Sequence, residues 1–154
     1  MMEMMSVLAV IAILATLAVP SYLDRTVREQ IKAALPLADI AKQPIAISWT
    51  LNQTFPADNA AAGLPVAEKI VANYVSSVAV HDGAIDLTFG NRANGAIQGK
   101  VLSVRPAVVE DAPIVPIAWV CGNAEAPNQM KVFGQNQTNV PDQMLPLECR
   151  ALRR

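Results

Sequence analysis

The 154-residue sequence predicts an α+β protein in which a long, kinked N-terminal helix packs on an antiparallel sheet of roughly four strands. Three observations carry this prediction. Residues 4–19 are apolar and uncharged, the residues after Pro20 follow a helical period, and Asp82-Gly83 separates two runs of alternating apolar residues. One globular domain plus one apolar segment accounts for the length and for the hydrophobic content of 53%.

The apolar segment 4–19 has nearly the length of a membrane anchor. At ~1.5 Å per residue it spans roughly 24 Å, and a helix continuing through Tyr22-Leu23 would approach the ~30 Å of a hydrocarbon core. A secretory signal is the first alternative, but no Lys or Arg precedes the run and Val19-Pro20-Ser21-Tyr22 is a poor cleavage site. A plain anchor is the second, and it leaves Glu3, directly before the run, unexplained. Because a carboxylate at the edge of such a segment is costly, the pattern predicts a membrane-anchored subunit that polymerises.

The residues after Pro20 form an amphipathic helix. Its apolar stripe has i, i+3 and i+4 spacing and comprises Leu23, Val27, Ile31, Leu35 and Ala38. We expect one helix from the N-terminus to about Leu51, with residues 1–21 in lipid or in a filament core and residues 22–51 continuing into a head formed by residues 52–154. Three prolines should bend or locally open this helix, namely Pro20, Pro36 and Pro44. Pro36 and Pro44 could alternatively divide it into separate helices.

The sheet is predicted to begin after a connecting loop at residues 52–70, which is rich in Pro, Gly, Asn and Asp. Asp82-Gly83 predicts a hairpin turn, because both residue types tolerate the positive φ that such a turn needs. Apolar residues alternate on both sides of it: Val78 and Val80 before, Ile85, Leu87 and Phe89 after. Further strands are expected at residues 100–105 and 116–121, with 130–133 a weaker candidate and the tail in loops.

Two cysteines, Cys121 and Cys149, predict a disulfide in an oxidising compartment, with two unrelated buried thiols as the alternative. The bridge would close a loop of roughly 29 residues and stabilise the fold by about 3–4 kcal/mol. His81 stands alone, so we expect no metal, no cofactor and no catalytic site. A net charge of −1 gives no general attraction for nucleic acids, and the composition favours a structural protein over an enzyme.

The chain resembles type IV pilins in segments along most of its length. The family's N-terminal motif is a Glu in a long apolar run closed by Pro-x-Tyr, found here between Glu3 and Pro20-Ser21-Tyr22. Other segments that resemble the family are Asn73–Val78, the Asp82-Gly83 hairpin, Phe89-Gly90-Asn91, Gly99-Lys100, Trp119–Gly122 and Leu145–Arg150. The N-terminal motif is shared with type II secretion pseudopilins, whereas the two-cysteine ending favours true pilins.

The resemblance implies a pilin fold with a disulfide-bounded region at residues 121–149, and a structural subunit of pili used for adhesion, twitching motility or DNA uptake. Glu3 and Pro20 would serve assembly. Glu3 would pair with the N-terminal amine of a neighbouring subunit, and the helix before Pro20 could lose regular hydrogen bonds in the filament. The implied partners are copies of the chain, the inner membrane, the assembly machinery, minor pilins, and a host surface or DNA. In a Gram-negative cell the chain would cross the inner membrane once and then become extracellular in the pilus.

The start of the sequence departs from the family. Members carry a basic leader that ends in Gly and is cut before a residue that becomes N-methylated, and their Glu is the fifth residue of the mature chain. Here Glu3 follows Met1-Met2. We expect that the leader and the first mature residues are missing from this sequence; a chain that cannot be processed is the alternative. A minor DNA-uptake pilin remains open as well, with basic side chains at Arg92, Lys100, Arg105 and Lys131.

Overall fold

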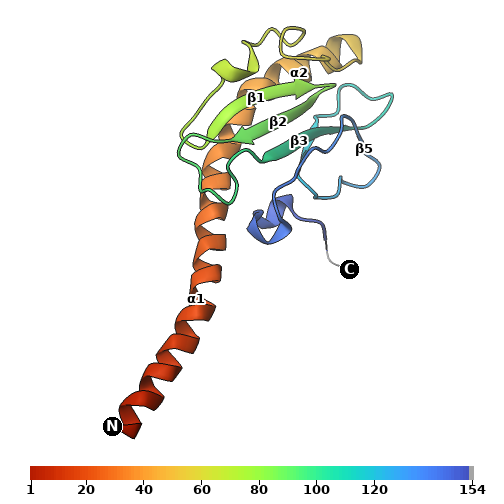
Figure 1. Cartoon of the computed structure of the whole chain (residues 1–154). Helices are drawn as coiled ribbons and strands as arrows, with labels where there is room; N and C mark the ends of the chain where they lie inside the picture. Colours follow the sequence, from red (N-terminus) through yellow and green to blue (C-terminus); the bar gives the residue numbers. More distant parts are fainter. Residues whose placement is uncertain (153–154) are drawn as a thin grey trace.

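A long N-terminal helix projects from a small head in the computed structural model, which describes residues 1–152 (Figure 1). It comprises α1 (Met2–Ala34), a 3₁₀ turn η1 (Leu35–Ala38) and α2 (Asp39–Asn52). The predicted helix to about Leu51 is therefore confirmed. It ends at Gln53, which adopts a left-handed conformation with φ of 51°.

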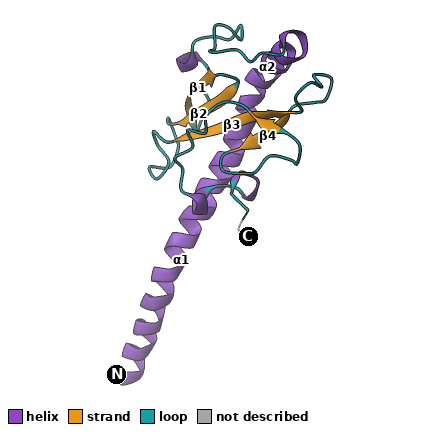
Figure 2. Ribbon diagram, turned by 90° about the vertical axis from the view of Figure 1, so that its right-hand side faces the viewer, coloured by secondary structure: helices purple, strands orange, loops and turns teal. Residues whose placement is uncertain are grey.

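The prolines affect this helix to different degrees. Pro36 stands at the start of η1, where the chain forms a 3₁₀ turn; its missing N–H and its ring disfavour a regular α-helical turn. Pro20 and Pro44 lie inside α1 and α2, which continue through them. The local opening predicted at Pro36 is thus observed. The alternative of separate helices is wrong, because α2 continues the course of α1 through η1 (Figures 1 and 2).

One stripe of the helix is buried against the head. It contains Val27, Ile31, Ala34, Ala38, Ala41, Ile45 and Trp49. The predicted stripe was correct at Val27, Ile31 and Ala38, but Leu23 is 44% exposed because it lies beyond the reach of the head. Three of these residues are alanines, so most of the side-chain bulk between helix and sheet comes from the sheet, which contributes Ile85, Leu87 and Phe89.

Within residues 1–152 the sheet is antiparallel and has five strands, the four expected ones and the weaker candidate at residues 130–133. Its strands are β1 (Val75–His81), β2 (Ala84–Phe89), β3 (Val101–Val108), β4 (Ala118–Cys121) and β5 (Lys131–Val132). The order is β1-β2-β3-β4, and the short β5 pairs with β3 beyond the last residue that pairs with β2 (Figure 2). The predicted hairpin is confirmed, since Asp82 and Gly83 have φ of 49° and 85°. The third strand extends past the predicted end at Arg105 and includes Pro106, whose carbonyl accepts a hydrogen bond from Phe133 N–H.

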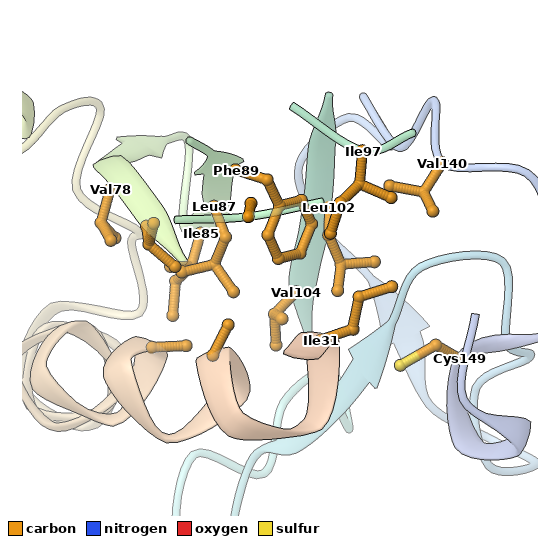
Figure 3. Close-up of a cluster of buried hydrophobic side chains, with 14 of the residues drawn as sticks. Ile31, Val78, Ile85, Leu87, Phe89, Ile97, Leu102, Val104, Val140 and Cys149 are labelled. Atoms are coloured by element: carbon orange, nitrogen blue, oxygen red, sulfur yellow. The ribbon is translucent and has the colours of Figure 1, made fainter. Parts of the chain in front are cut away.

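The core lies between the helix and one face of the sheet, as the sequence predicted (Figure 3). Ile31 of the helix faces a group of side chains from β2 and β3 that includes Ile85, Leu87, Phe89, Leu102 and Val104. Ile97, Val140 and Cys149 close the end of this core nearest the projecting part of α1. Burial of this face fixes the direction in which α1 leaves the head.

The C-terminal region is a loop with two 3₁₀ turns, η3 (Asp142–Met144) and η4 (Leu147–Cys149). A disulfide joins Cys121, at the end of β4, to the fully buried Cys149 in η4. Asn123 N–H donates to the Cys149 carbonyl at 2.9 Å, which adds a backbone link beside the bridge. The predicted disulfide is confirmed.

Candidate assembly site

The head does not pack against the first half of α1. Every residue from Met1 to Leu23 is exposed, and the segment extends away from the head (Figure 1). Its most apolar 18-residue window has no buried residue, and the helix is long and apolar enough to cross a membrane. An exposed surface of this kind in water is a large free-energy cost, so the segment needs lipid or other protein around it.

Glu3 lies in the first turn of this exposed helix, where the partial positive charge of the helix N-terminus favours a carboxylate. In the described part of the chain its carboxylate makes no ion pair; its carbonyl accepts a hydrogen bond from Ser6 Oγ at 2.8 Å. The next charged residue along the helix is Asp24, roughly 30 Å away at ~1.5 Å per residue. Once α1 enters an apolar environment, the Glu3 carboxylate needs a cation close to it.

Pro20 marks the point where the apolar half of α1 meets the amphipathic half. It has no N–H to donate, so the carbonyl of Thr16 lacks its usual helical partner. Pro20 and Glu3 are about 25 Å apart along the helix and do not form one site. The two predicted assembly residues are instead a charge at one end of the apolar segment and a weak point in its hydrogen-bond ladder at the other.

A buried polar cluster on the other face of the sheet escaped sequence reasoning. Asp86 is 4% exposed. Its Oδ1 accepts a hydrogen bond from Ser103 Oγ, and its Oδ2 lies 3.0 Å from His81 Nδ1. Ser103 Oγ also accepts from Gln137 N–H at 2.9 Å. Asp86 lies between Ile85 and Leu87, which belong to the core, and nothing in the sequence indicated that the C-terminal segment covers the opposite face of the sheet.

This cluster contains a Ser, a His and an Asp, yet its geometry is not that of a nucleophilic triad. In a triad the imidazole lies between serine and carboxylate and removes the serine proton. Here the carboxylate lies between the other two, and Ser103 donates to Asp86 instead of His81. The cluster therefore ties the strands β2 and β3 to the C-terminal segment and has no catalytic arrangement.

Asp86→Ala is expected to lower the free energy of unfolding by about 1–3 kcal/mol, because Ser103 loses the acceptor of its buried hydroxyl. Thermal unfolding of the full chain in detergent, followed by tryptophan fluorescence, measures this loss. His81→Ala is the matched control, since Asp86 keeps the hydrogen bond from Ser103 and loses only the contact with a half-exposed imidazole, which should cost less than about 1 kcal/mol. Equal midpoints for Asp86→Ala and the unmodified chain would contradict the assignment.

An aromatic cluster joins the end of the helix to the head. Trp49 of α2 stacks on Phe55 with ring centroids 4.9 Å apart, and Phe133 lies 5.2 Å from Phe55. A side chain at Gly83 would meet Phe55 at 2.8 Å, so the hairpin turn presses against the same cluster. The far end of the helix is thus rigidly attached, which leaves the N-terminal half as the free part.

Two of the four basic side chains considered for DNA binding have partners within the head. Arg105 donates to the carbonyl of Gly122 at 3.1 Å, and its partial burial lowers the pKa of its guanidinium. Lys131 Nζ contacts Glu110 Oε1 at 2.7 Å. Two of the four side chains considered for DNA binding are therefore engaged within the chain, and Arg92 and Lys100 remain.

Comparison with known proteins gives consistent matches. A family model described as Pilin, a bacterial filament protein, matches residues 27–150. The type IV major pilin protein PilE of Neisseria gonorrhoeae is 31% identical, with 97% of this chain and 91% of that protein covered. A fimbrial protein of Neisseria meningitidis serogroup B is 28% identical over the same shares, and the fimbrial protein EcpC of Eikenella corrodens is 35% identical with 82% of each chain covered.

Proposed function

Because the chain belongs to the type IV pilin family, a structural and non-enzymatic family, we propose that it polymerises through the exposed half of α1 into a cell-surface filament. The observation that carries this proposal is the uncovered apolar segment from Met1 to Leu23. Residues 1–21 form the membrane and filament-core part in this proposal, residues 22–51 the connection, and residues 52–154 the head on the filament surface.

The proposed pathway has two environments for the same segment. Before assembly the apolar half of α1 crosses the inner membrane once, and after assembly it lies among the corresponding helices of other subunits. Burial stabilises each state by roughly 25 cal/mol per Å² of apolar surface, but this term has no direction and does not fix the axial register. Glu3 supplies the register, since only one docking position places its carboxylate next to the N-terminal amine of a neighbour.

The role of Pro20 in this proposal is mechanical. The ladder of α1 already lacks one hydrogen bond there, so the turns before Pro20 can open when subunits are compacted in the filament. Continuous α-helical density across residues 12–20 in the assembled filament would contradict this role.

The finer functions also belong to this proposal. The relatives are described as major pilin or fimbrial proteins, which supports the role of the abundant subunit over that of a minor DNA-uptake pilin. One of the four basic side chains considered for DNA binding, Lys131, is paired with the carboxylate of Glu110, which weakens the DNA-uptake alternative. The match between this chain and the relatives extends through the disulfide region, which favours a pilin over a secretion pseudopilin. We also propose that the filament serves adhesion and twitching motility in a Gram-negative cell. Its partners in this proposal are the pilus assembly machinery and minor pilins.

The test is the non-reduced intact mass of the protein in filaments sheared from the cell surface. We expect an abundant species that lacks two hydrogens for the disulfide and carries one methyl group at a processed N-terminus. Absence from the sheared fraction, with the protein retained in the membrane, would contradict the major-subunit role. It would favour a minor pilin, a pseudopilin or an unassembled chain.

A further inference from the structure

A cavity of ≈ 590 Å³ lies between α1 and the C-terminal turns η3 and η4. Its lining includes Arg28 of α1 and, from the C-terminal region, Asp142, Gln143, Leu147 and Arg150. The C-terminal turns lie beside α1 where the helix leaves the head, on the side toward the N-terminus (Figure 1). The cavity is therefore at the level where the projecting helix begins.

Two guanidinium groups give this cavity a cationic wall. Arg28 Nε is buried and has no hydrogen-bond partner in the described part of the chain, where Arg28 also forms no ion pair. Arg150 is held in place by hydrogen bonds from its Nε to the Leu145 carbonyl at 2.8 Å and from a terminal nitrogen to the Gln143 carbonyl at 3.0 Å. Carbonyl partners orient a guanidinium without cancelling its charge.

One carboxylate, Asp142, lines the cavity beside the two guanidinium groups, so the three groups together leave the cavity with a net positive charge. Asp142 Oδ1 accepts from Asn123 Nδ2 at 2.7 Å, and Asp142 forms no ion pair with either arginine. The unpaired donors of two guanidinium groups suit an anion that offers several oxygen acceptors, which is the chemistry of a phosphate.

Two exposed leucines, Leu147 and Leu152, also line the cavity. Leu147 is 79% exposed and Leu152 is 70% exposed. Exposed leucines next to arginines are typical of surfaces that enter the boundary between lipid headgroups and acyl chains. A purely aqueous phosphate would gain nothing from these leucines.

The position of the cavity along α1 matches the headgroup layer. Residues 2–21 span about 30 Å as a helix, the thickness of a hydrocarbon core, and Arg28 follows about 10 Å later. Helical side chains lean toward the helix N-terminus, so the side chain of Arg28 points back toward the membrane. Polar headgroups occupy roughly 5–8 Å on each side of the core, within reach of this side chain.

We propose that this cavity binds the phosphate of an anionic phospholipid in the leaflet next to the head. Arg28 and Arg150 hold the phosphate oxygens, and Leu147 and Leu152 rest on the upper part of the acyl chains. The inference rests on the proposed membrane insertion of α1. The bound lipid orients the head on the membrane before the subunit enters a filament.

The test uses the full chain in lipid nanodiscs made of phosphatidylcholine alone or with a minor fraction of phosphatidylglycerol. Lipids retained after mild detergent extraction are counted by native mass spectrometry. We expect phosphatidylglycerol to be enriched over its share in the disc, and Arg28→Gln to reduce this enrichment about fivefold. Arg25→Gln is the matched control, because Arg25 is an exposed arginine of the same helix that does not line the cavity. Leu147→Gln should weaken retention without removing a charge.

The outcomes separate the lipid site from its premise. Equal loss in Arg25→Gln and Arg28→Gln, or no enrichment in a correctly inserted chain, overturns the lipid site alone. Failure of the chain to enter discs of either composition overturns the proposed membrane insertion and the site with it. Millimolar inorganic phosphate is added to phosphatidylcholine discs as a further arm; Arg28-dependent broadening of its ³¹P resonance would assign the cavity to free phosphate instead. Circular dichroism and an intact disulfide establish that each variant is folded.

Discussion

Glu3→Ala is expected to abolish incorporation of the chain into filaments while the protein accumulates in the membrane. The substitution makes the apolar segment easier to insert, so membrane anchoring persists. It removes the only charged side chain on the exposed segment before Asp24, and with it the interaction that we propose distinguishes the correct docking position from slipped ones. Immunoblots of sheared filaments and of membrane fractions measure the two populations.

The magnitude follows from the cost of an unpaired charge in an apolar environment. Insertion scales give about 2.5–3.5 kcal/mol for an acidic residue at the centre of a membrane helix. Because Glu3 lies at the edge of the apolar segment, this cost sets an upper limit of roughly a hundredfold on the preference for the docking position that neutralises it. The alanine variant loses that preference and keeps the non-directional burial. Subunits then aggregate weakly or stay in the bilayer.

Three further variants make the result specific to the carboxylate. Glu3→Asp keeps the charge and should retain part of the assembly, whereas Glu3→Gln keeps the size and should fail like Glu3→Ala. Ser6→Ala lies one turn along the same exposed face, removes only a hydroxyl that bonds the helix backbone, and should assemble normally. Abundant normal filaments from Glu3→Ala would reject the proposed role of Glu3.

The overall fold was accessible from the sequence because its signals are local. The spacing of Val27, Ile31 and Ala38 defined the buried helix face, and Asp82-Gly83 defined the hairpin without knowledge of anything distant. The two-residue strand β5 gave only a weak signal, because a strand this short has almost no periodicity. Its existence depends on the partner β3, which continues through Pro106 to Val108.

The candidate site residues also differ in whether the local sequence reveals them. Glu3 stood out because a charge next to an uncharged run is visible in one dimension. Asp86 and Arg28 did not stand out, since each resembles an ordinary surface residue until distant segments are folded over it. Asp86 is buried by the segment around Gln137, and the cavity beside Arg28 exists only because the disulfide region returns to α1. Tertiary closure of this kind leaves no periodic trace in a single sequence.

The disulfide determines whether that closure persists. Besides the bond to Cys121, the fully buried Cys149 contributes to the end of the hydrophobic core. The bridge closes a loop with a sequence separation of 28. In the chain-entropy model a loop of this length is worth about 3–4 kcal/mol.

Cys149→Ser is therefore expected to lower the unfolding midpoint of the full chain in detergent by more than about 10 °C and to reduce filament display on the cell surface. The loss combines the missing cross-link with a buried hydroxyl in place of sulfur. The double variant Cys121→Ser with Cys149→Ser removes the free thiol that could otherwise cross-link wrongly, and dithiothreitol treatment of the unmodified chain removes the bond without changing any other atom. All three should lose the contribution of the cross-link, and reduction by dithiothreitol, which leaves both sulfur atoms in place, should cost the least. The bridge does not hold the C-terminal region in place if the unmodified chain and Cys149→Ser unfold at the same temperature under oxidising conditions and display filaments equally. In that case the shape of the cavity beside Arg28 depends on the surrounding hydrogen bonds.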